Sequence, residues 1–153
     1  MSKRRLSLIA FSVTVIAGAN LSLMSTEAQG SYATQQAAKA AIADYARQIS
    51  AAFKDYNVSE SLDRFGRCNL VLYKSSFASP SYTINVWETK TARAEGSMVK
   101  VVCLDTECIR QHSSVTYPSL SIKSFAVHSA AEAEQIAPLI DQMRMQCAIV
   151  RQG

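Results

Sequence analysis

Residues 82–104, YTINVWETKTARAEGSMVKVVCL, contain two stretches with the composition of β-strands, joined by a short connection. Val, Ile, Thr and Tyr are frequent in Tyr82–Thr89 and in Met98–Leu104, and these residue types are enriched in strands. The connection Thr91–Ser97 contains Gly96, and a link of this length can join only antiparallel neighbours. The segment therefore predicts the centre of an antiparallel sheet.

Stretches of the same composition on either side extend this sheet. Asn69–Ser75 precedes the central segment, and Cys108–Ser113 and Leu120–Val127 follow it. Because the connections are short, each strand is expected to pair with the next, which makes the sheet a meander of four to five strands. In the last stretch the apolar residues change parity, which predicts a bulge near Ser124.

A helix is predicted before the sheet, from Ala33 to Tyr56, because apolar residues recur there at spacings of three and four. Ser31 is a candidate N-cap, and Asn57 is expected to end the helix. The polar residues 59–67 that follow are interpreted as a link with room for one helical turn. The apolar face, expected to pack on the core, consists of Ala38, Ile42, Tyr45, Ile49, Phe53 and Tyr56.

A second helix is predicted at the C-terminal end. Ser129 and Glu132 form a capping box, so this helix should begin at Ala130. Pro138 lacks a backbone N–H and is expected to kink or divide the helix near Glu134. Its apolar stripe consists of Ile136, Leu139, Ile140, Met143, Cys147 and Val150. The expected fold class is α+β, with an N-terminal and a C-terminal helix packed on the antiparallel meander sheet.

The first 28 residues have the pattern of a secretory signal. Basic residues at positions 3–5 precede the apolar run Leu6–Ala19, and a small-residue cleavage site follows. The run is shorter than the roughly 20 residues that a membrane-spanning helix needs. Cleavage is expected after Ala28, with a site after Ala19 as a second possibility. The alternative is an uncleaved anchor whose apolar run extends to Met24.

Loss of this leader changes the charge of the chain. Three of the 16 basic residues and one of the 12 acidic residues lie in residues 1–28, which leaves 13 and 11 and lowers the net charge from +4 to +2. The remaining basic residues are scattered, whereas nucleic-acid binding needs them gathered on one face. We therefore expect residues 29–153 to form a single α+β domain that is periplasmic or secreted, has no membrane span and binds no nucleic acid.

The four cysteines favour two disulfides, because an exported chain matures under oxidising conditions. Cys103 and Cys108 flank a four-residue segment, so a hairpin turn would place them opposite each other on neighbouring strands. Cys68 and Cys147 then pair and connect the first strand to the last helix. Zinc bound by these cysteines with the two histidines is the alternative. Since thiols in this compartment are consumed as disulfides, we expect no metal and no other cofactor.

Only His112 and His128 are suited to act as general bases near neutral pH, and each is followed by serine. The chain contains no Gly-x-Ser-x-Gly sequence for a nucleophile turn, and its glycines do not have the spacing of a phosphate-binding loop. Ser129 already has a role as a helix cap. A small hydrolase that uses either histidine with a nearby serine is therefore an alternative, and the leading interpretation is not an enzyme.

Trp87 is the residue that suggests a binding surface. In the predicted strand Tyr82–Thr89, Tyr82, Ile84 and Val86 share one apolar face, and Trp87 lies on the opposite, polar face. The polar face consists of Thr83, Asn85, Trp87 and Thr89. An aromatic residue among polar neighbours is typical of a contact site, unless a helix or loop covers it. The sequence thus predicts a non-enzymatic module that binds a protein or cell-envelope partner. An inhibitor of an exported enzyme fits the same features.

Overall fold

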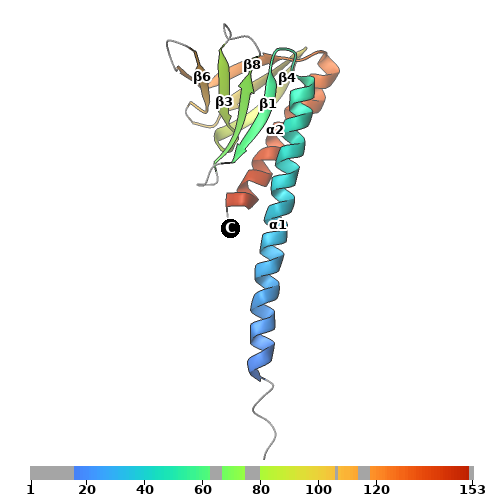
Figure 1. The fold of residues 1–153 in the computed structure, drawn as a ribbon. Coiled ribbons are helices and arrows are strands. Elements are labelled where there is room, and N and C mark those ends of the chain that lie inside the picture. The colour runs from blue at the N-terminus through green and yellow to red at the C-terminus, as the bar shows by residue number, and fades with distance from the viewer. Residues whose placement is uncertain (1–15, 63–66, 75–79, 106, 114–117, 152–153) are drawn as a thin grey trace, which may run out of the picture.

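The computed structural model describes residues 16–62, 67–74, 80–105, 107–113 and 118–151, with side chains from residue 31 onward. A long helix, α1 (Ile16–Ala52), comes first, antiparallel strands follow, and helix α2 (Ala130–Arg151) closes the chain. In Figure 1, α1 extends well beyond the body that the strands and α2 form. The fold is α+β, as the sequence predicted.

The strands form two antiparallel sheets, one of five strands in the order β1-β2-β3-β6-β7 and one of three strands in the order β4-β5-β8. A 3-10 turn, η1 (Val86–Glu88), separates β3 from β4. The strands are β1 (Asn57–Leu62), β2 (Cys68–Tyr73), β3 (Ser81–Asn85), β4 (Thr89–Glu95), β5 (Met98–Cys103), β6 (Ile109–His112), β7 (Ser119–Leu120) and β8 (Ile122–Ala126).

The two sheets meet at a corner that the chain crosses three times, at η1, between β5 and β6 and at Ser121. Three backbone hydrogen bonds of 2.8 Å connect these crossings: Asn85 N–H to Cys108 O, Leu104 N–H to Glu88 O, and Cys103 N–H to Ser121 O. From β3 to β4, from β5 to β6 and from β7 to β8, the chain therefore leaves one sheet at the corner and continues in the other. The expected pairing of Met98–Leu104 with Cys108–Ser113 is absent, since β6 pairs with β3 and β5 with β8. The expected single sheet therefore divides in two, because strands at such a corner bend to wrap around a core.

The bend also changes the strand boundaries. The predicted strand Tyr82–Thr89 ends at Asn85, where η1 begins. Most of the predicted connection Thr91–Ser97 belongs to β4, and the turn to β5 is formed around Gly96. Gly96 has a φ of 60°, which glycine adopts without the steric cost that a side chain brings. The alternating polar residues of β4 had obscured this strand in the sequence.

Two further predictions in the sheet are wrong. Residues 59–62 of the segment interpreted as a link belong to β1, which pairs with β2 along its whole length, while residues 63–66 lie outside the described residues. The polar character of β1 comes from outward-facing residues such as Ser61, whereas Val58 is buried. The predicted bulge near Ser124 is absent from the regular pairing of β5 with β8, and the irregularity lies at Ser121 between β7 and β8.

Helix α1 differs from its prediction at both ends. It runs without interruption through Ser31, which is therefore not an N-cap. It ends at Ala52 and not at Asn57, because Phe53 leaves the helix and forms a bridge with Val127. This bridge places the segment after α1 beside the end of β8.

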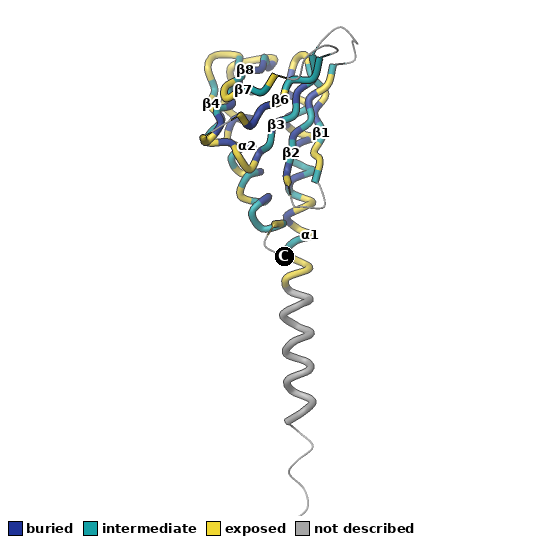
Figure 2. The backbone as a smooth tube through the Cα atoms, turned by 90° about the vertical axis from the view of Figure 1, so that its left-hand side faces the viewer, coloured by how far each residue is buried: buried dark blue, intermediate teal, exposed yellow. Residues whose placement is uncertain are grey.

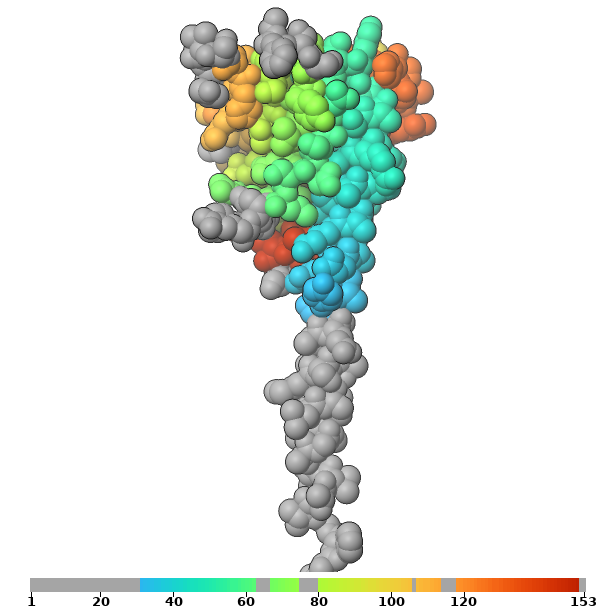
Figure 3. Space-filling view, viewed as in Figure 1, coloured from blue at the N-terminus to red at the C-terminus, as the bar shows by residue number. Residues whose placement is uncertain are grey.

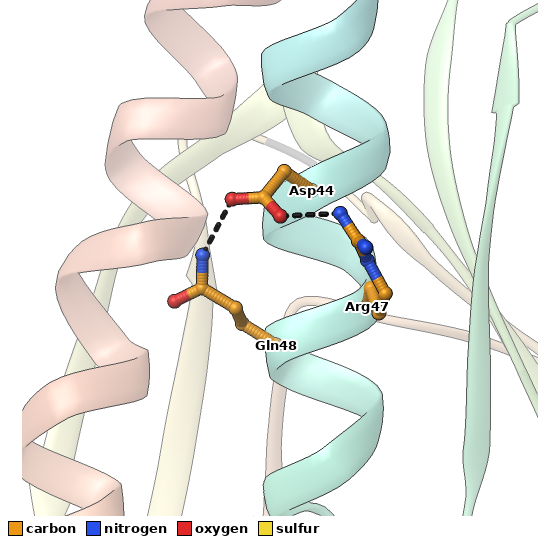
Figure 4. Close-up of polar contacts among 3 residues, drawn as sticks. All are labelled: Asp44, Arg47 and Gln48. Carbon is orange, nitrogen blue, oxygen red and sulfur yellow. Dashed lines mark hydrogen bonds and ion pairs between the residues drawn. The ribbon is translucent and has the colours of Figure 1, made fainter.

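The predicted apolar face of α1 is confirmed. Ala38, Ile42 and Ile49 are buried, and α1 packs on α2 and on β1. The opposite face is polar: Asp44 accepts hydrogen bonds from Arg47 at 2.5 Å and from Gln48 at 2.7 Å (Figure 4). Such exposed pairs at spacings of three and four contribute little to stability, so burial of the apolar face is what holds α1 in place.

Helix α2 begins at Ala130, as predicted. The Glu132 N–H donates to Ser129 Oγ at 3.2 Å, and the Ser129 hydroxyl donates to the Glu132 carboxylate at 3.0 Å. The helix is not divided at Pro138, which lies on its exposed side. The carbonyl that loses its partner belongs to Glu134, another exposed position, where water can replace the missing N–H.

The core lies between the helices and the inner faces of both sheets. Figure 2 shows β1 and β2 on one side of the body and α2 with β4 on the other. At the centre, the Phe125 ring packs on those of Phe53 and Tyr82, with centroid distances of 5.6 and 5.5 Å. α2 packs on β4, β5 and η1 as well as on α1. The outer face of the five-stranded sheet therefore lies outside these helical contacts.

Both predicted disulfide pairings are confirmed, but the reason given for one of them is wrong. Cys68 in β2 is bonded to Cys147 in α2. Cys103 is bonded to Cys108. Since β5 and β6 lie in different sheets, this second bond does not join hairpin neighbours. It connects the two ends of the segment in which the chain crosses from the three-stranded sheet to the five-stranded sheet.

Candidate functional site

The outer face of the five-stranded sheet is polar. Alternation sends Leu70 and Ile84 into the core and leaves their neighbours Asn69, Thr83 and Asn85 half-buried on the outside. In the pairing of β2 with β3, Asn69 lies opposite Asn85. Figure 3 views the body from the side where these strands and β6 lie next to one another, with α1 along one edge.

A cavity of about 320 Å³ opens on this face, next to the corner between the sheets. It draws residues from β2, β3, η1, β6 and the segments before β2 and β6. Its lining consists of Arg67, Asn69, Thr83, Asn85, Glu88, Glu107, Cys108, Arg110 and His112. The half-buried strand residues form a neutral floor, and exposed charged residues surround it.

The two ends of the cavity, which lie apart along the strand direction, carry different charged residues. Arg110 lies opposite Thr83 and His112 lies opposite Ser81, both away from the corner. Glu88 belongs to η1 and Glu107 to the crossing segment, so both carboxylates lie at the corner itself. The cavity therefore has a basic end at Arg110 and His112 and a corner end with two carboxylates, where Arg67 also contributes.

The floor of the cavity consists of the amide and hydroxyl side chains of Asn69, Asn85 and Thr83. Asn85 Oδ1 exposes almost no surface and has no hydrogen-bond partner among the described residues, so this oxygen lies beneath the cavity surface. Thr83 Oγ1 and His112 Nε2 are 2.9 Å apart and orient each other. The floor can thus both accept and donate hydrogen bonds.

The four residues of the predicted binding surface separate in the structure. Thr83 and Asn85 line the cavity. Trp87 lies in η1 and is 39% exposed, with the Arg151 guanidinium 5.1 Å from its ring. Thr89 is buried and its hydroxyl donates to the Val86 carbonyl at 2.7 Å. The alternation that grouped them ends at Asn85, because the chain turns there into η1.

Sequence reasoning did not find Arg67, Asn69, Glu88, Glu107 or Arg110 as candidate site residues. The alternation carries a signal in β2, since Asn69 is a polar position between two buried ones, and a weaker one in β6, where Arg110 follows the buried Ile109. The two carboxylates lie in the turns of the corner and have no such pattern. Their position beside the sheet face depends on the bend.

The histidines considered for catalysis have different surroundings. His112 lies in the cavity and contacts a threonine hydroxyl, while Ser81 is its neighbour across the strands. Thr83 is in the middle of β3, which pairs with β2 and β6, so its backbone N–H groups are engaged and cannot form an oxyanion hole. His128 is exposed, and the hydroxyl of Ser129 is engaged in the helix cap.

A second cavity, of about 440 Å³, lies between β4 and α2. Arg144 donates to the carbonyls of Thr89 at 2.6 Å and Lys90 at 3.0 Å, so α2 covers the open edge of β4. Burial raises the pKa of Asp141, while Arg144 and the Ala92 N–H act in the opposite direction. These contacts satisfy the backbone of an edge strand, which is a structural role.

The described residues provide neither a metal-binding cluster nor a membrane-spanning helix. In this part of the chain, no group of three or more His, Cys, Asp or Glu side chains is placed to hold a metal ion. The cysteines are all in disulfides. No described helix combines the length and the apolar character needed to cross a bilayer.

No protein-family model matches this chain, and comparisons with curated proteins and with solved structures find no match. The polar cavity on the sheet face, with different charged residues at its two ends, is the candidate functional site of the described residues.

Proposed function

We propose that this protein is an exported, disulfide-bonded binding module without a catalytic role, which recognises a protein or cell-envelope partner through the cavity face. Its working form is a single α+β domain of residues 29–153 in the periplasm or outside the cell. The two disulfides support an oxidising compartment. The first buried residue in the described part of α1 is Ala38, so removal of residues 1–28 leaves this core intact.

One observation carries the binding proposal. The cavity combines the outward-facing amide side chains of Asn69 and Asn85 with exposed charges of both signs at its rim, and Glu88, Glu107 and Arg110 form no ion pair among the described residues. Structural polar groups in a folded domain are normally satisfied by the fold itself, as Arg144 shows at the edge of β4. A surface that leaves such groups oriented toward one hollow is typical of a recognition site.

Mass spectrometry of the purified protein tests the export part. We expect an N-terminus at Gln29 and a mass that increases on reduction by two hydrogen atoms for each of two disulfides. The fold should lose no stability with the leader, because the described packing of α1 begins at Ala38. Recovery of an intact Met1 together with free thiols from the cytosol would contradict export.

Photo-crosslinking in the producing cells tests the contact face. A photoreactive amino acid at position 110 is expected to give a discrete adduct with an envelope component. The same amino acid at position 39, an exposed position on α1 outside the cavity, should not give this adduct. Absence of an adduct at 110, or identical adducts at both positions, would contradict recognition through the cavity.

The 2.9 Å contact between Thr83 Oγ1 and His112 Nε2 favours one second candidate, a small hydrolase. Hydrolysis of p-nitrophenyl esters distinguishes the two functions. The binding module predicts no rate above that of the buffer. A rate that His112→Gln abolishes and His128→Gln preserves would instead support the hydrolase. An inhibitor of an exported enzyme would use the same face, and the crosslinked partner would identify it.

A further inference from the structure

We infer that the cavity binds a short peptide by its two free ends, with the terminal carboxylate at Arg110 and the terminal ammonium between Glu88 and Glu107. This inference rests on the proposed function, because it names the ligand class of the same cavity. It is based on three features of the cavity: the opposite charges at its two ends, the separation of these ends, and the polar side chains between them that can form hydrogen bonds.

Three of the charged groups at the two ends are not paired by the fold. Among the described residues, Arg110, Glu88 and Glu107 form no ion pair with one another or with other side chains. Arg110 presents a guanidinium, whose donors match the two oxygens of a carboxylate. Two carboxylates at the corner match an ammonium group, which has three donors. The cavity is thus complementary to a ligand with opposite charges at its ends.

The separation of these ends selects the length of the ligand. At the corner, the Asn85 N–H donates to the Cys108 carbonyl. Two residues further along the strands, Arg110 pairs with Thr83. At about 3.3 Å per residue, the backbone positions of the two ends are roughly 7 Å apart along the strand. A free amino acid carries both charges on one carbon and cannot span this distance. An extended peptide advances at most about 3.6 Å per residue, so two or three residues fit.

The floor between the ends suits a peptide backbone. A threonine hydroxyl such as that of Thr83 can accept from a peptide N–H, and Asn85 also lines the cavity. Asn69 lies beside it across the strands, and an amide side chain can donate to a peptide carbonyl. Since the floor is neutral and polar, small side chains are favoured over large apolar ones.

Trialanine is the probe for this inference. The purified mature protein is titrated with trialanine, N-acetyl-trialanine and trialanine amide, and amide chemical shifts are followed by NMR. We expect binding of trialanine with shifts at Asn69, Thr83 and Asn85. Each blocked peptide, and free alanine, should bind at least tenfold more weakly, because each lacks one charge or the required length.

Two variants assign the ends of the peptide. Arg110→Gln should abolish the preference for trialanine over its amide and keep the preference over the acetylated peptide. Glu107→Gln combined with Glu88→Gln should have the reverse effect. Lys39→Gln, which removes an exposed charge outside the cavity, is the control and should bind like the wild type.

The inference is overturned if trialanine causes no shifts at millimolar concentration, or if the blocked peptides bind as tightly as trialanine. These outcomes are distinguishable from a failure of the proposed function. A crosslinked envelope partner without trialanine binding would refute the peptide inference alone. Trialanine binding without any crosslinked partner would refute the envelope partner and retain the peptide site.

Discussion

Asp141 and Arg144 illustrate what single residues contribute to this fold. Both come from α2 and contact the backbone of β4, where Arg144 binds two carbonyls and Asp141 accepts from Ala92 N–H. Burial of the Asp141 carboxyl is the main cause of its raised pKa. The folded protein therefore favours the protonated form of this group more than the unfolded chain does.

The first prediction follows for Asp141→Asn. Because the pKa of Asp141 is raised by folding, its contribution to stability is present below the ordinary value of 3.8 and is lost as pH rises through the folded pKa. Asparagine keeps the shape and cannot ionise. The free energy of unfolding of the variant minus that of the wild type should therefore increase from pH 3 to pH 7, as urea unfolding measures. Asp44→Asn, an exposed carboxylate on α1, is the control. A difference that falls with pH contradicts the prediction.

At the scale of elements, α2 is the clearest case in which local sequence determines where a helix begins. Its first turn is fixed by the reciprocal contacts of Ser129 and Glu132. Its apolar stripe is then buried against α1 and the strands, and Ile136, Ile140 and Met143 are part of the core. Pro138 is tolerated because it lies on the opposite face.

The cap gives a second prediction. Ser129→Ala removes the acceptor of the Glu132 N–H and should lower the free energy of unfolding by about 1 kcal/mol. Ser129→Asp keeps an acceptor and places a negative charge at the helix N-terminus, so it should retain wild-type stability within a few tenths of a kcal/mol. Urea unfolding near neutral pH measures both. Equal losses in the two variants would show that the hydroxyl contact does not stabilise α2.

For the whole molecule, the two disulfides constrain very different lengths of chain. The bond between Cys68 and Cys147 closes 79 residues of sequence separation and connects the five-stranded sheet to α2. The bond between Cys103 and Cys108 closes a separation of 5 and holds the corner. In the chain-entropy account, the longer loop restricts the unfolded chain more strongly.

The third prediction compares their removal. Replacing Cys68 and Cys147 together by alanine should lower the free energy of unfolding by about 4.5 kcal/mol, and replacing Cys103 and Cys108 by about 2 kcal/mol. Guanidinium unfolding of the oxidised proteins measures the two losses. The double variant of the short loop serves as the matched comparison, since it also removes two sulfur atoms. A larger loss for the short loop would contradict the entropic account.

Local patterns in the sequence determined a large part of this protein. The apolar faces of both helices, the start of α2 and the strand character of β2, β3 and β5 depend on periodicity and capping within a few residues of each other. The cysteine pairing was also predicted, although Cys103 and Cys108 pair across the corner between the sheets and not across a hairpin. The site was only partly foreseen: Thr83 and Asn85 were expected at a contact surface and His112 as a reactive group, and all three line the cavity.

Only the tertiary structure decided where the sheet bends and what the bend brings together. The crossings at η1, between β5 and β6 and at Ser121 coincide in space because of strand pairings between residues far apart in the sequence. Such pairings follow from burying a common core, which no local pattern encodes. Glu88 and Glu107 therefore meet the floor around Asn85 as a consequence of global packing.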